Sequence, residues 1–174
     1  MLNSTTLFSG LGVAPATNSY FSIATTTVGV GGVSSIVFNS IPQTYKHLQI
    51  RATVGAAGEI QGFFNGDSTA TNYYRHTVYG QGSSAAATAA QSYGIYPAYL
   101  PTAGAFVQDI LDYANTNKNK TTRSLWGTDN NGSGYVGLYS AVWFNTDAVN
   151  TISFSPVGGG NFPQYTQFAL YGVN

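Results

Sequence analysis

The sequence predicts an all-β protein, an antiparallel β-sandwich of jelly-roll type with an extended N-terminal arm. Short apolar or alternating segments recur along the chain, and clusters rich in Gly and Asn separate them. Helix patterns are nearly absent, because even the Ala-rich residues 85–90 carry no large apolar side chains at helical spacing. The length of 174 residues suits one domain. We expect the arm at residues 1–19 and the sandwich at residues 20–174.

The strands are expected in order along the chain, each from a short run of apolar or alternating residues. The clearest alternation places Leu48, Ile50 and Val54 on one face and polar residues on the other, which is the period of a half-buried strand. The full set of expected strands is 36–38, 48–54, 60–65, 73–79, 106–113, 121–127, 135–144, 150–154 and 166–173.

Turns are predicted where residues that tolerate positive φ gather, at 65–67, 115–117, 129–132 and 158–161. Residues 129–134 also place oxygen ligands at the first, third and fifth positions of a calcium loop. The twelfth position, which should be a bidentate Glu, is Ser140. A hairpin turn is therefore the favoured interpretation, and weak calcium binding stays open.

Charge is scarce in this chain. Only 7% of the residues are charged, and six basic side chains cancel six acidic ones. An ordinary domain is about one quarter charged. Such a chain has no net field to attract nucleic acid or an anionic membrane, so we expect neither as a partner. The first residues lack the pattern of a signal peptide and Cys is absent, which favours assembly in the cytoplasm.

The N-terminal arm is apolar but Gly-rich. Its large side chains are Leu7, Phe8, Leu11 and Val13, and we expect them to order against a neighbouring subunit of the assembly. The alternative is a frayed terminus, which is the usual fate of such a segment.

Several long phrases resemble a family of small structural proteins of tailed bacteriophages and prophages. They are residues 23–29, 34–38, 40–51, 64–67, 72–76, 109–118 and 168–173, which read IATTTVG, SSIVF, SIPQTYKHLQIR, FNGD, NYYRH, DILDYANTNK and FALYGV. The likeness covers about residues 20–174. Family members are described as virion, tail-fibre or head-decoration proteins. The resemblance implies a β-sandwich and a place in the particle, and it carries over no catalytic residues.

The chemical motifs in the chain do not assemble into a catalytic or metal site. Residues 80–85 fit a relaxed dinucleotide fingerprint but lack the helix and the acidic residue that should follow, so a loop is predicted. Asp109 and Asp112 lie three apart on an expected strand and should face opposite sides. His47 and His76 are the only histidines and have no close-spaced motif. We expect no enzyme, no metal and no cofactor.

Two surface features are candidate contact sites. Tyr93, Tyr96 and Tyr99 recur every three residues in a segment whose two prolines predict a loop or an edge strand. We expect these rings to form a subunit interface, with a glycan-binding surface as the alternative. The only basic cluster is Lys118, Lys120 and Arg123, which predicts a solvated turn or an electrostatic contact with the particle.

The function that we expect is that of a capsid decoration, or cement, protein. Such a protein binds the major capsid protein on the outer surface of the shell and stabilises the assembled state by mass action. Copies of this chain are expected to associate, with a trimer favoured because capsids have local threefold sites. The alternative is a tail-fibre or receptor-binding module that recognises host carbohydrate.

Overall fold

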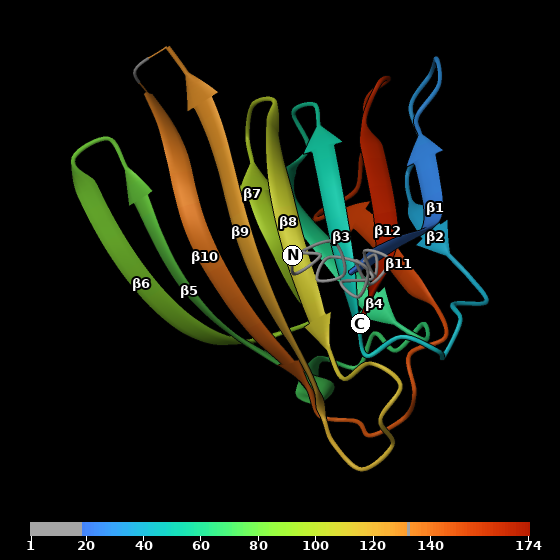
Figure 1. The fold of residues 1–174 in the computed structure, drawn as a ribbon. Coiled ribbons are helices and arrows are strands. Elements are labelled where there is room, and N and C mark those ends of the chain that lie inside the picture. Colours follow the sequence, from blue (N-terminus) through green and yellow to red (C-terminus); the bar gives the residue numbers. More distant parts are fainter. Residues whose placement is uncertain (1–18, 132) are drawn as a thin grey trace, which may run out of the picture.

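The computed structural model describes residues 19–131 and 133–174, which fold into two packed antiparallel sheets (Figure 1). The predicted all-β sandwich is confirmed. The larger sheet has eight strands, in the order β1 (Tyr20–Thr27), β12 (Gln167–Val173), β3 (His47–Val54), β8 (Gly104–Leu111), β9 (Lys120–Asn130), β10 (Ser133–Trp143), β5 (Tyr73–Gln81) and β6 (Ser84–Ser92). The smaller has four, in the order β2 (Ile36–Phe38), β11 (Ile152–Pro156), β4 (Gly58–Phe64) and β7 (Ile95–Leu100).

The strand order is that of a jelly roll with two hairpins added. β1, β12, β3 and β8 form one four-stranded layer, β2, β11, β4 and β7 form the other, and the chain alternates between the layers as it does in that fold. The hairpins β5–β6 and β9–β10 are inserted into this path and extend the first layer beyond β8. In Figure 1, β10, β5 and β6 therefore reach past the smaller sheet on the left.

The core lies between the two layers and is rich in aromatic rings. Phe168 is its centre, with ring centroids 5.5 Å from Phe106, 5.2 Å from Phe154 and 5.3 Å from Phe162. The alternation predicted for residues 48–54 is confirmed, since Leu48, Ile50, Ala52 and Val54 are all buried. Burial of these side chains is the main favourable contribution to folding.

The predicted turns fall between strands. Asn131, between β9 and β10, has a φ of 48°, and Asn65, directly after β4, has a φ of 52°; Asn tolerates this left-handed conformation better than most residues. Residues 129–131 and 133–134 thus belong to a β hairpin, as the sequence favours. Residues 80–85, predicted as a loop, instead continue β5 and β6 through a tight turn at Gly82, where φ is 56°.

Two strands were not expected from the sequence: β1 has no clear alternation, and β6 is the Ala-rich segment. β7, which contains Pro97, was expected as a loop or an edge strand. Proline is tolerated in β7 because this strand is an edge of the smaller sheet, as the sequence allows. The predicted arm, with Leu7, Phe8, Leu11 and Val13, lies outside the described residues except for Ser19.

Helical structure in residues 19–131 and 133–174 is limited to one short 3-10 turn, η1 (Ala70–Asn72). Among these residues the structure contains no helix with the length and apolar character to cross a membrane.

Candidate functional site

The outer face of the eight-stranded sheet carries a row of exposed aliphatic side chains. Val107, Leu125, Leu138 and Val78 lie opposite one another on β8, β9, β10 and β5, and their exposed fractions range from 38% to 60%. Val136, 59% exposed, lies one pleat along β10. We call these five residues the open-face row. Contiguous exposed apolar side chains on a soluble domain mark an interaction surface.

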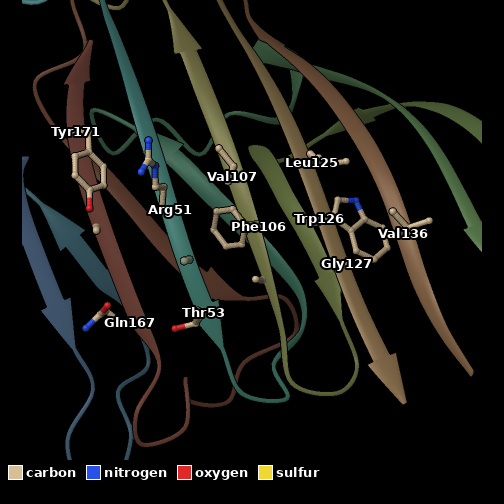
Figure 2. A pocket seen from close by; sticks show the side chains of 13 residues that line it. Arg51, Thr53, Phe106, Val107, Leu125, Trp126, Gly127, Val136, Gln167 and Tyr171 are labelled. Atoms are coloured by element: carbon tan, nitrogen blue, oxygen red, sulfur yellow. The ribbon is translucent and has the colours of Figure 1, made fainter. Parts of the chain in front are cut away.

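A shallow depression of about 550 Å³ lies at one end of the open-face row. Figure 2 shows Val107, Leu125 and Val136 on neighbouring strands, with Arg51 and Tyr171 further along the sheet. The Arg51 guanidinium lies 4.7 Å from the ring centroid of Tyr20 and 4.8 Å from that of Tyr171. The apolar depression is thus bordered by a cation held between two aromatic rings.

A polar row runs beside the open-face row. The Arg51 Nε–H donates to Gln49 at 2.7 Å, and the Gln49 side chain donates to an Asp109 carboxylate oxygen at 2.7 Å. Asp109 lies directly opposite Arg123 on the neighbouring strand. These contacts hold Asp109 on the outer sheet face, whereas Asp112 follows the end of β8 and accepts a hydrogen bond from Lys118. The two carboxylates do not share a site.

The predicted basic cluster of Lys118, Lys120 and Arg123 does not form one charged surface. Lys120 is fully buried, and its ammonium donates to the backbone carbonyls of Asn115, Lys118 and Thr146 at 2.7–2.9 Å. The expectation of an exposed Lys120 is therefore wrong, because three loop carbonyls need this donor. Lys118 is exposed and paired with Asp112, and Arg123 is exposed on the outer sheet face. Of the three basic residues, only Lys118 and Arg123 are accessible to a partner.

The three tyrosines do not form one surface either. Tyr93 is 65% exposed, Tyr96 is 6% exposed, and Tyr99 is half-buried at a cleft. Tyr93 lies between β6 and β7, and the register of β7 with β4 shifts between Ile95 and Ala98, so the three positions do not share one regular strand face. Burial raises the pKa of Tyr96, the nearby Glu59 carboxylate adds to that effect, and Arg75 opposes it.

The cleft lies where the larger sheet reaches past β7, on the inner side of the overhanging strands. It encloses about 350 Å³. Five aromatic side chains from four strands line it: Tyr79, Tyr99, Trp126, Tyr135 and Tyr139. The polar lining consists of Glu59, Arg75, Thr77, Gln81 and Thr88. We call this feature the aromatic cleft.

The aromatic rings of the cleft pack on one another around Trp126. Tyr135 is stacked on the indole with centroids 6.4 Å apart, and Tyr139 meets it edge-on at 5.2 Å. Tyr99 stands perpendicular to Tyr135 at 5.3 Å. The Trp126 Nε1–H is buried, and no acceptor for it is found among the described residues. Mutual packing fixes the rings before any partner arrives.

An ion pair lies among these rings. A Glu59 carboxylate oxygen is 2.5 Å from an Arg75 guanidinium nitrogen, and the two side chains are 30% and 22% exposed. The guanidinium also lies 4.0 Å from the ring centroid of Tyr96. Burial raises the pKa of Tyr139, Glu59 adds to that effect, and Arg75 opposes it, so the phenol remains protonated at neutral pH. The aromatic cleft thus offers neutral and charged hydrogen-bonding groups with no net charge.

Gly137 allows the indole of Trp126 to lie against β10. A Cβ at residue 137 would come within 2.5 Å of the Trp126 ring. We expect Gly137→Ala to lower the free energy of unfolding by about 1–3 kcal/mol, because the ring must leave its packed position. Chemical denaturation measures the change. Gly80→Ala on β5 is the control, since its Cβ would be no closer than 3.7 Å to another atom; an equal loss in both variants would contradict the explanation.

The residues of the aromatic cleft were not predicted as a site, except for Tyr99. They come from β4, β5, β6, β7, β9 and β10, so no local spacing connects them. Within 19–131 and 133–174, no group of three or more metal-binding side chains converges. The His47 Nδ1 accepts a hydrogen bond from the Asp112 backbone N–H at 3.0 Å.

The fold and its two surfaces define an antiparallel β-sandwich of jelly-roll order with an open apolar face and an aromatic cleft. Comparisons with protein-family models, with curated proteins and with solved structures found no match to this chain.

Proposed function

We propose that this protein is a structural component of a bacteriophage particle, a decoration protein that binds the outer surface of the major capsid protein shell. The observation that carries the proposal is the open-face row, which leaves aliphatic side chains of four adjacent strands in solvent. None of its five side chains is charged, so docking the row against a protein shell requires little desolvation of charge by the row itself.

The fold is compatible with this role. Jelly rolls occur in viral capsid proteins and in lectins. The sequence resemblance to phage structural proteins supports the same proposal.

Association of copies of this chain is part of the proposal, and β6 is the strand edge best suited to it. The other three sheet edges carry features that hinder pairing: β2 has only three residues, β1 has a bulge between Ser22 and Ala24, and β7 contains Pro97. β6 has nine residues with neither charge nor proline. Unprotected edges of this kind pair with further strands. The expected trimer stays a prediction.

The copy number of the chain in purified virions tests the proposal. Quantitative mass spectrometry against the major capsid protein should give a ratio approaching one copy per capsid subunit. A handful of copies per particle would contradict decoration and support the tail.

A charged substitution in the open-face row tests the docking surface itself. Leu125→Asp should weaken binding to undecorated shells about tenfold or more, because a carboxylate would have to be desolvated at the interface. Val37→Asp is the matched control, since Val37 is 44% exposed on the smaller sheet. Equal binding of both variants, measured by co-sedimentation, would exclude the open face as the docking surface.

A further inference from the structure

We propose that the aromatic cleft is a binding site for a neutral glycan, with room for a short saccharide. This inference does not rest on the proposed attachment to a shell, because the aromatic cleft and the open-face row lie on opposite faces of the eight-stranded sheet. It assigns a ligand to the region that the two inserted hairpins add to the jelly roll.

The first argument is shape and size. The cleft volume of about 350 Å³ lies at the lower end of the range of about 300–1,000 Å³ that small-molecule sites span. Tyr79, Tyr99 and Tyr135 are half-buried, so part of each ring remains accessible within the cleft. A sugar ring has an apolar face of C–H groups that packs on such aromatic surfaces, while its hydroxyls point sideways.

The second argument is the hydrogen-bonding inventory. A sugar hydroxyl both donates and accepts, so it is best matched by a site that offers both functions. Glu59 provides carboxylate acceptors, and Arg75 provides guanidinium donors of which the ion pair uses only part. The Thr77 and Thr88 hydroxyls are hydrogen-bonded to each other at 2.7 Å, which leaves one of their two donors and further acceptor positions, and the neutral phenol of Tyr139 can donate or accept.

The third argument is charge. Glu59 is the only glutamate in the chain, and it lies against Arg75 in a protein with twelve charged residues in all. A partly buried ion pair adds little to stability, because desolvation offsets the attraction between the two ions. A role in ligand recognition explains the position of the ion pair among five aromatic rings better than a role in stability does. Because the pair is neutral overall, the cleft favours an uncharged ligand over a phosphate or a sialic acid.

Calorimetric titration of the purified full-length chain tests this assignment. The probes are lactose, maltose, cellobiose and diacetylchitobiose as neutral disaccharides, with sialyllactose as the anionic comparison. At least one neutral disaccharide should bind saturably with a Kd of about 1 mM or lower. Absence of binding by all four at about 20 mM would overturn the proposal, and so would tighter binding of sialyllactose than of every neutral probe.

Two variants locate the binding. Glu59→Gln keeps the shape of the side chain and removes its charge, and it should weaken the bound disaccharide about tenfold or more. Tyr79→Ala removes a ring of the overhang and should do the same. Tyr165→Ala, at a ring that is 78% exposed and outside the cleft, should leave affinity unchanged. Thermal unfolding confirms that each variant is folded. Binding that is insensitive to both cleft variants would place the saccharide elsewhere and overturn the assignment.

Discussion

Lys120→Met is expected to lower the free energy of unfolding by about 3–5 kcal/mol, because it leaves loop carbonyls without their donor. The Lys120 ammonium binds Asn115 and Lys118 in the β8–β9 loop and Thr146 in the β10–β11 loop, at 2.7–2.9 Å. It therefore ties two connections at one end of the sandwich. Methionine fills a similar volume, so the loss reports the missing hydrogen bonds more than a cavity. Denaturant titration measures the free energy.

Lys118→Met provides the control for this prediction. Lys118 is two residues away, but its side chain is 60% exposed and its ion pair with Asp112 is solvated. Exposed pairs of this kind contribute about 0–1 kcal/mol. We expect the two variants to differ clearly in denaturation midpoint. Similar midpoints would mean that the buried ammonium is not a structural link.

Asp67→Asn is expected to lower the free energy of unfolding by about 2–4 kcal/mol at neutral pH. The carboxylate accepts hydrogen bonds from the Trp143 indole at 2.7 Å, from the Asn72 amide at 2.8 Å and from the Thr69 backbone N–H at 2.9 Å. An asparagine side chain has one oxygen and one NH2 group, so its NH2 group would face one of these N–H donors and that hydrogen bond would be lost. The turn after β4 would then lose its connection to the buried end of β10.

The same residue makes stability depend on acid pH. Burial acts to raise the pKa of Asp67, but the hydrogen bonds from Asn72, Trp143 and Thr69 outweigh it and lower the pKa from 3.8 to about 2. A carboxyl with a lowered folded-state pKa stabilises the fold above its unfolded pKa, and this contribution disappears as pH falls from about 4 to about 2. The stability difference between wild type and Asp67→Asn should shrink over that interval.

A second carboxyl separates this explanation from a general effect of charge. Asp129→Asn, at an exposed position next to the β9–β10 turn, removes the same charge without removing buried hydrogen bonds. We expect stability within about 0.5 kcal/mol of wild type. A pH-independent difference between wild type and Asp67→Asn across the acid range would contradict the role given to Asp67.

The sequence predicted the sandwich because its signals are local. Alternation at residues 48–54 and the Gly- and Asn-rich turns depend only on near neighbours in the chain. β6 was missed for the opposite reason. Its small residues are mostly exposed on both faces, so it carries no alternation, and pairing with β5 alone makes it a strand. Tertiary pairing here outweighs the weak strand propensity of alanine.

The aromatic cleft could not be predicted, because residues far apart in the sequence form it and no spacing pattern connects them. Glu59 and Arg75 are 16 residues apart, and the Trp126 that packs beside Tyr135 belongs to a different hairpin from Tyr79. The spacing of Tyr93, Tyr96 and Tyr99 was visible, but Tyr93 precedes β7 and the pairing of β7 with β4 is irregular beside Tyr96, so the spacing does not produce one surface. Lys120 was predicted to be exposed because a basic residue near a turn is ordinarily solvated. The three carbonyls that accept its hydrogen bonds come from two loops, which only the folded chain brings together.

The two tryptophans lie in different parts of the molecule, so their fluorescence can report on each part separately. Trp143 is buried in the core with its indole bonded to Asp67, whereas Trp126 packs in the cleft wall, where its indole N–H has no acceptor among the described residues. Indole emission depends on the polarity and hydrogen bonding around each ring. Replacing Trp126 by Phe therefore leaves an emitter that follows unfolding, and replacing Trp143 leaves one that follows events in the cleft. The chain contains no other tryptophan, so the indole fluorescence of each single-tryptophan variant comes from one known position.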